Sequence, residues 1–247
     1  FGGLITGCGN LEIAGNISGS ATSTGSFGKV LSAGGVFEGA GGSSLTIDSS
    51  NIALGYQALT SSTSATNNVA IGSSAGISVT SGTANNLIGY YAGRYISTGE
   101  YNTMFGSEAG QYMNGSSNTF IGYSAGRGGS TSAPYGNGAQ NVAIGREALK
   151  AISSGSFNVA IGRDSLKIAT DGDHNIALGY SSGVALTSGD DNVLIGKNTA
   201  INLSTGTNNI AIGENALYLE NSGTYAIAIG YRAGYKNRIS STNYNTF

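Results

Sequence analysis

One short motif returns along most of this chain at an almost constant spacing, and this periodicity constrains the fold more than any other feature. A typical unit reads "NVAIG", with an Asn at its head in ten of eleven units and a Gly at its end. Of the ten steps between these Gly residues, eight are 17 residues long, one is 16 and one is 23. The repeated positions that we expect to be structural are Asn51, Gly55, Asn68, Gly72, Gly89, Gly106, Gly122, Gly145, Gly162, Gly179, Gly196, Gly213 and Gly230.

A period of this length predicts an all-β fold built from stacked coils. Apolar triplets between Gly- and Ser-rich clusters mark short strands joined by turns. Seventeen residues span about 56 Å when extended, enough for two strands of about five residues and two turns. With 42 Gly and only 10% charged residues, the composition excludes a helical bundle. We therefore expect a parallel β-roll or β-solenoid of about eleven 17-residue coils over residues 51–247, with the leading Asn residues forming an amide ladder.

Three segments depart from the repeat. The long step contains an insertion loop at 127–140, which holds the only proline, Pro134. Residues 1–50 lack the motif, but 11–17 and 44–48 alternate as strands do, so we expect a small β-rich shaft or connector module there. At the other end, 245–247 read "NTF" and begin an incomplete twelfth unit, which predicts further chain or a neighbouring subunit beyond it. Since the chain opens on Phe1 rather than Met, we expect a fragment or a processed form.

The side-chain alternation within each unit predicts an oligomer. In "NVAIG" the Val and Ile should share one face, which we assign to the inside of the coil, while the middle residue points to the other face. The middle residue is nevertheless apolar in every unit. The middle residue is large at Leu87, Met104 and Phe120, and there the residue before it is polar. A gain of apolar volume on one packing surface should therefore be matched by a loss on the other. A strand that is apolar on both faces is buried on both faces, and the second surface should pack against other chains.

The motif also carries a family resemblance. "NNVAIGSSAG" (67–76) and its relatives resemble the head repeat of trimeric autotransporter adhesins of the YadA type, which implies a left-handed parallel β-roll packed as three copies. Units such as "NTFIGYSAG", and the segment "GNISGSATSTGSFGKVLSAGG" (15–35), look like parts of bacteriophage tail fibres. The resemblance extends over residues 51 to 234. It implies a homotrimer.

Few residues are candidates for a catalytic or metal-binding site. The one acidic cluster is Asp171, Asp173, Asp190 and Asp191, which adjacent coils should stack at a loop edge. Such an edge is either a weak calcium site, because Ca²⁺ favours clustered carboxylates, or a solvated acidic surface. His174 beside it reads as a turn residue, and Cys8 is alone, so no intrachain disulfide is possible. We expect no catalytic residues, no cofactor and no enzymatic activity.

Two further columns have alternative readings. Arg146 and Arg163 share one column, with Glu147 and Asp164 in the next, which predicts ion pairs between coils. A tyrosine follows the repeat Gly in five units, where it either packs against its neighbours or offers an aromatic platform to sugars. These residues are Tyr56, Tyr90, Tyr123, Tyr180 and Tyr231.

These observations favour a structural, non-enzymatic segment of a trimeric phage tail fibre that supports or takes part in host-surface attachment. The alternatives are the head of a bacterial surface adhesin, a subunit of an extracellular filament, and an ice-binding solenoid, which lacks its expected Thr column. We expect self-association, with a host glycan or protein as partner. The scattered basic residues argue against nucleic acid, and no apolar run could span a membrane. The expected location is the virion, or alternatively the bacterial surface or the extracellular space.

Overall fold

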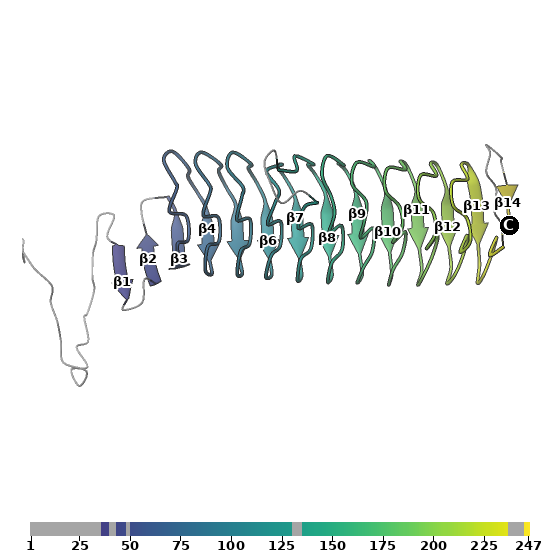
Figure 1. The fold of residues 1–247 in the computed structure, drawn as a ribbon, viewed down its shortest axis with the longest axis horizontal. Helices are drawn as coiled ribbons and strands as arrows, with labels where there is room; N and C mark the ends of the chain where they lie inside the picture. The colour runs from purple at the N-terminus through teal and green to yellow at the C-terminus, as the bar shows by residue number, and fades with distance from the viewer. Residues whose placement is uncertain (1–35, 40–42, 48–49, 130–134, 237–244) are drawn as a thin grey trace, which may run out of the picture. The chain divides into compact units, whose positions relative to one another are not determined.

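The computed structural model describes residues 36–39, 43–47, 50–129, 135–236 and 245–247, and these residues contain strands and turns but no helix. β1 (Val36–Gly39), β2 (Ser43–Ile47) and β3 (Ile52–Tyr56) pair antiparallel. From β3 to β14 each strand pairs in parallel with the next, in chain order (Figure 1). The remaining strands are β4 (Val69–Ile71), β5 (Asn86–Ile88), β6 (Thr103–Phe105), β7 (Thr119–Ile121), β8 (Val142–Ile144), β9 (Val159–Ile161), β10 (Ile176–Leu178), β11 (Val193–Ile195), β12 (Ile210–Ile212), β13 (Ala226–Ile229) and β14 (Asn245–Thr246). The predicted parallel β-solenoid is confirmed.

Each coil contains one short strand rather than the two longer strands expected from its length. The rest of the coil is a series of turns, because left-handed backbone conformations recur at fixed positions. In the coil after β8 these are Glu147 (φ 57°), Leu149 (φ 48°) and Phe157 (φ 61°). Backbone hydrogen bonds still join equivalent turn positions of adjacent coils, for example from Gly76 N–H to Ala92 O at 3.0 Å. The coils are therefore paired along the turns as well as along the strands.

The predicted asparagine ladder runs through the buried interior. Asn68 Nδ2 donates to Asn51 Oδ1 at 3.1 Å and to Gly82 O at 2.9 Å, and the Asn68 backbone N–H also donates to Asn51 Oδ1. The bond from each Asn backbone N–H to the preceding Asn Oδ1 recurs in every later coil up to Asn209, and the two side-chain bonds recur with it in all of these coils except that of Asn118, which keeps only its bond to Gly138 O. Each side chain thus satisfies its neighbour's backbone as well as its neighbour's amide, which buried polar groups require.

Close packing between adjacent coils requires a glycine at the repeat position. At Gly55 the backbone has φ 137°, and a Cβ atom would lie 2.6 Å from the carbonyl oxygen of Gly72. Other residues avoid that φ, and no side chain fits the space. The structural assignment of this position follows from both constraints.

The two faces of the strand are the reverse of the assignment made from the sequence. The middle residue points into the coil, as at Ala70, which is fully buried, whereas Val69 and Ile71 are only half-buried on the outer face. The fully buried middle residues include Leu87, Met104 and Phe120. The interior of the coil also holds fully buried turn residues such as Leu149 and Ile152, which leaves room for one inward strand side chain rather than for the bulkier pair.

The interior volume is shared between the middle residue and the residue six positions later. After Leu87, Met104 and Phe120 the later residue is Gly, and after Leu194 it is the small Ala200. A Cβ at Gly126 would lie 2.5 Å from the Phe120 ring. Where the middle residue is Ala143, the later one is Leu149, and both are fully buried. This sharing inside the coil differs from the volume trade inferred from the sequence, which paired the middle residue with the first strand residue, because the first strand residue lies on the outer face.

The irregular segments are only partly described. β2 confirms the strand expected at 44–48 up to Ile47, whereas 11–17, Cys8 and Pro134 lie outside the described residues. Residues 1–35 as a whole lie outside them. Within the insertion, the chain is described to Gly129 and again from Tyr135. β14 pairs Asn245 with Ala226, so these residues continue the register of the repeat.

Candidate functional site

The outer face of the strands forms an apolar surface along the whole roll. The first strand position is Val or Ile in eight of eleven coils, and the third position is Leu, Ile or Phe in all eleven. These side chains are substantially exposed, with 44% exposure at Ile52, 40% at Ile161 and 59% at Ile229. Large continuous apolar surfaces on a protein mark interaction sites. The sequence predicted such a second surface but placed the wrong residues on it.

A polar interval interrupts this surface in three consecutive coils. Asn86, Thr103 and Thr119 occupy the first strand position there, and Asn86 is exposed. The tyrosines predicted after the repeat Gly are also exposed, by 45–48% at Tyr56, Tyr90, Tyr123 and Tyr180 and by 68% at Tyr231.

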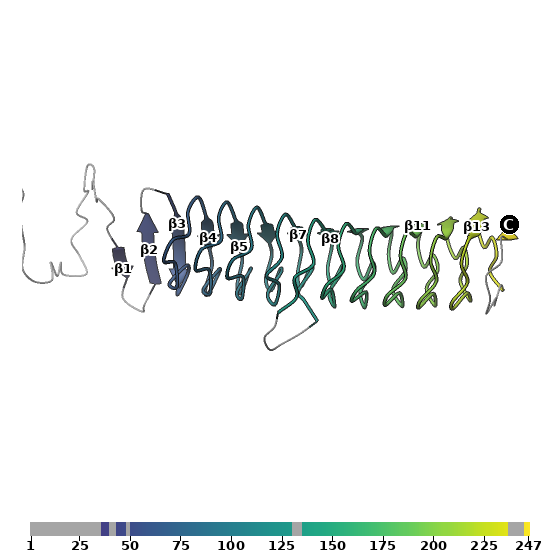
Figure 2. The same cartoon turned by 90° about the horizontal axis from the view of Figure 1, so that it is seen from above.

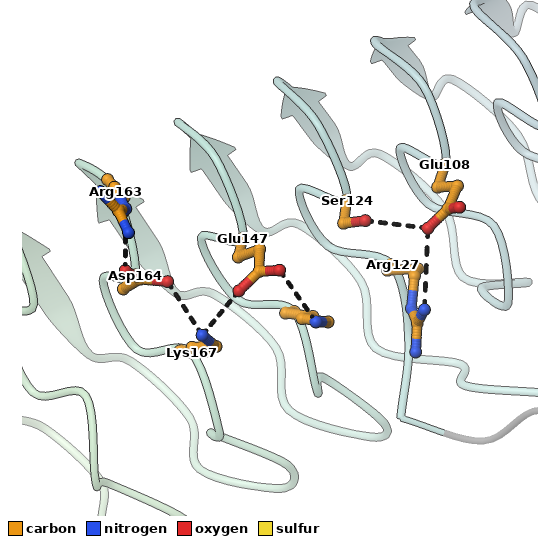
Figure 3. Close-up of polar contacts among 8 residues, drawn as sticks. Glu108, Ser124, Arg127, Glu147, Arg163, Asp164 and Lys167 are labelled. Carbon is orange, nitrogen blue, oxygen red and sulfur yellow. Dashed lines mark hydrogen bonds and ion pairs between the residues drawn. The ribbon is translucent and has the colours of Figure 1, made fainter.

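A network of ion pairs follows the turn that succeeds β8 and β9 (Figure 3). Glu147 accepts from Lys150 of its own coil at 3.0 Å and from Lys167 of the next coil at 2.6 Å. Lys167 also binds Asp164 at 3.0 Å, and Asp164 binds Arg163 at 3.1 Å. Ion pairs between coils are present, but not those predicted, because Glu147 pairs with Lys167 of the next coil and Arg163 pairs with Asp164 of its own coil. Arg146 forms no ion pair with the described residues.

Proton affinities in this network are shifted by hydrogen bonding. The ammonium groups of Lys167 and Lys150 lower the pKa of Glu147 to about 2, against the opposing effect of burial. Glu147 and Asp164 in turn raise the pKa of Lys167. Both shifts stabilise charged side chains that hold successive coils together. Every carboxylate of this network has a cationic partner, and the bond between Glu147 and Lys167 joins two successive coils.

Carboxylates of the acidic loop edge accept hydrogen bonds from the loop of the preceding coil. The Asp190 Oδ1 atom accepts the backbone N–H of Asp173 at 2.8 Å, and Asp173 Oδ1 accepts the backbone N–H of Ser156 at 2.6 Å. Asp171 accepts from Ser154 Oγ at 2.6 Å. The sequence correctly placed Asp173 above Asp190, but these oxygens stabilise the loop of the preceding coil.

Asp191, the fourth residue of the calcium candidate, is exposed, and its backbone N–H donates to Asp173 O. Among the described residues, no group of three or more His, Cys, Asp or Glu is arranged to hold a metal ion. His174 stacks on Phe157 with 4.9 Å between ring centroids, so it occupies a turn position against an aromatic neighbour.

An aromatic and cationic cluster was missed by the sequence reasoning. Tyr95 and Tyr112 occupy the same position of consecutive coils and stack at 5.3 Å, and Tyr135 of the insertion stacks on Tyr95 at 4.6 Å. Arg94 lies over the rings of Tyr91 and Tyr95, at 4.1 and 5.0 Å from their centroids. A compositional signal was available, because seven of the chain's 14 tyrosines lie between residues 90 and 135.

The remaining part of the cluster carries mixed charge. Arg127 Nη1 lies 3.6 Å from Glu108 Oε2, which also accepts from Ser124 Oγ at 2.9 Å (Figure 3). The Arg127 guanidinium also lies 5.6 Å from the ring centroid of Tyr112. A hydrogen bond with Tyr91 raises the pKa of the Tyr90 phenol.

No family model, curated protein or solved structure matches this chain. Within the described residues there is no helix of the length and apolarity that crossing a membrane demands. The function therefore has to be argued from the surfaces of the roll.

Proposed function

We propose that this chain is a structural, non-enzymatic segment of a trimeric fibre, of the kind found in phage tail fibres, in which three rolls pack through their outer strand faces. The fibre supports or takes part in attachment to a host surface, and its expected location is the virion. The repeat motif supplies the resemblance to trimeric fibres and to adhesin heads, and the exposed strand face supplies the physical argument.

The observation that carries the proposal is the apolar outer face of β3 to β13. Parallel strands are ordinarily covered on both faces, yet here one face carries Val, Ile and Leu side chains that the single chain leaves exposed, such as Leu54 at 46% and Ile227 at 38%. Burying this surface against identical copies would remove apolar area from water along the full length of the roll. Because the roll repeats at one register, three copies can align their columns over their entire length.

A charge on this face tests the proposal. Ile161 lies in the middle of the strand series and is 40% exposed, so Ile161→Lys is compatible with the fold of one chain but places an unpaired charge within the expected interface. We expect the particle mass, measured by light scattering, to fall from three chains to one while the circular dichroism spectrum is preserved.

The matched control is Ser188→Lys, which adds the same charge at an exposed loop position. This variant should keep the mass of the unmodified protein. If both variants show the same mass as the unmodified chain, the strand face is not an interface and the proposal is wrong.

A further inference from the structure

The single insertion in the roll returns to the chain beside the tyrosine stack. Gly136 forms a parallel bridge with Met113, and its backbone N–H donates to Tyr112 O at 3.0 Å. This pairing places Tyr135 next to Tyr112 of the preceding coil. The Tyr135 ring nevertheless lies closer to Tyr95, at 4.6 Å, than to Tyr112, at 6.2 Å, so it bridges both rings. The insertion therefore completes a cluster of three aromatic rings.

The three rings form a local surface rather than a feature of every coil. Positions equivalent to Tyr95 carry Ser78 in the coil before and Ala151 in the coil after the insertion. The rings are half-buried and nearly parallel, with interplanar angles of 12° and 23° to Tyr95. Figure 2 shows that the backbone on both sides of 130–134 leaves the roll on the side away from the strand arrows. The cluster is thus separate from the apolar strand face.

Arg94 adds an unneutralised positive charge to this surface. It forms no ion pair with the described residues, whereas five other cationic side chains of the roll do. The Arg94 Nε atom is covered and has no hydrogen-bond partner, and the same is true of Nε of Arg127, whose guanidinium lies 5.6 Å from the Tyr112 ring centroid. Such unmet donors are rare in native proteins. The guanidinium is held in place by Tyr91 and Tyr95, so it is pre-organised for an anion.

We propose that Tyr95, Tyr112 and Tyr135, with Arg94 beside them, bind a carboxylated saccharide of the host surface. The C–H face of a sugar ring packs against the tyrosine rings, their phenol groups bond its hydroxyls, and Arg94 pairs with its carboxylate. This inference rests on the proposed attachment role and specifies its ligand class. A neutral sugar would leave Arg94 unpaired, and Glu108 is already bound to Arg127 and Ser124.

Binding is tested by calorimetry on the full chain with matched pairs of probes. The acidic probes are tetragalacturonate, tetramannuronate, a hyaluronan tetrasaccharide and 3′-sialyllactose, and the neutral partners are methyl-esterified tetragalacturonate and lactose. We expect at least one acidic probe to bind, with an affinity at least tenfold above that of its neutral partner. If none of the four binds, or if oligoglutamate binds as tightly as the best of them, the saccharide site is refuted.

Two variants locate the site. Arg94→Gln and Tyr95→Leu should each lower the affinity for the bound probe at least tenfold. The matched control is Arg163→Gln, because Arg163 also lies over a tyrosine, Tyr180 at 5.6 Å, but already pairs with Asp164. This control should stay within twofold of the unmodified chain, and equal losses in both arginine variants would overturn the assignment.

The two proposals fail in different measurements. If the unmodified chain forms a species of three chain masses but binds none of the acidic probes, this site is refuted and the trimeric fibre is left intact. If a variant does not fold, the comparison of each acid with its neutral partner on the unmodified chain still decides the question.

Discussion

Asn68 Oδ1 accepts two hydrogen bonds from Asn85, one from its backbone N–H at 2.9 Å and one from its side-chain Nδ2 at 3.0 Å. A single buried oxygen thereby fixes both the start of the next strand and the orientation of the next amide. Repetition of this relationship transmits the register from coil to coil, which explains why Asn opens nearly every unit.

Removing one amide from the middle of the ladder should be costly. Asn158→Ala deletes the acceptor of Asn175 and the donor to Gly172 O, and it leaves their buried partners unsatisfied. We expect a loss of about 3 kcal/mol in the free energy of unfolding, measured by urea denaturation. The control Asn202→Ala removes an exposed amide bonded to Tyr218 O and should cost less than about 1 kcal/mol. Equal costs would mean that the ladder is not what stabilises the coils.

The shared interior volume predicts a compensating pair of substitutions. Phe120→Ala should cost about 3 to 5 kcal/mol because it leaves a cavity, and Gly126→Leu alone should clash with the Phe120 ring. Combined, they reproduce the arrangement of Ala143 with Leu149, where Leu adopts φ 48°, close to the 52° of Gly126. Urea denaturation of all four combinations should show strong positive coupling. Additive losses would contradict the shared volume.

The ion-pair network predicts a specific dependence of stability on pH. Because the pKa of Glu147 is lowered to about 2 in the folded chain, its stabilisation is complete above its ordinary value of 4.5 and is lost as the pH falls towards 2. Glu147→Gln should therefore lower the free energy of unfolding by about 1 to 2 kcal/mol at pH 7 and by much less near pH 2. Thermal unfolding across this range provides the measurement.

The control for this experiment is Glu214→Gln, since the Glu214 side chain is 44% exposed and Lys197 is its single ion-pair partner among the described residues. Exposed pairs contribute little, so its unfolding profile should follow that of the unmodified chain. A Glu147→Gln difference that persists unchanged at pH 2 would show that the carboxylate charge does not stabilise the coils.

The register of the fold could be predicted from the sequence, but the orientation of the strand could not. A constant period places Ala70 beside Leu87 without any structural information, and the observed pairing agrees. Alternation shows only that Val69 and Ile71 share a face, and it does not say whether that face is inside. The answer depends on the width of the coil, which is set by left-handed turn residues such as Glu147 that no local propensity identifies.

The candidate sites were predictable to different degrees. Stacking of Asp173 on Asp190 followed from the period alone, but the use of their oxygens by backbone N–H groups depends on the path of the loop. The tyrosine cluster depends on an insertion whose return beside Met113 is set by tertiary pairing. The concentration of tyrosines identifies the region in the sequence. The contact between Tyr135 and Tyr95 could be recognised only in the structure.

The central claim is that the apolar strand face is covered by two further copies of the chain. Light scattering coupled to size-exclusion chromatography of residues 1–247 tests it most directly. We predict a single species of three times the 24.7 kDa chain mass, unchanged over a tenfold dilution. A well-behaved species of one chain mass would contradict the account, because it would leave the exposed face of β3 to β13 without a partner.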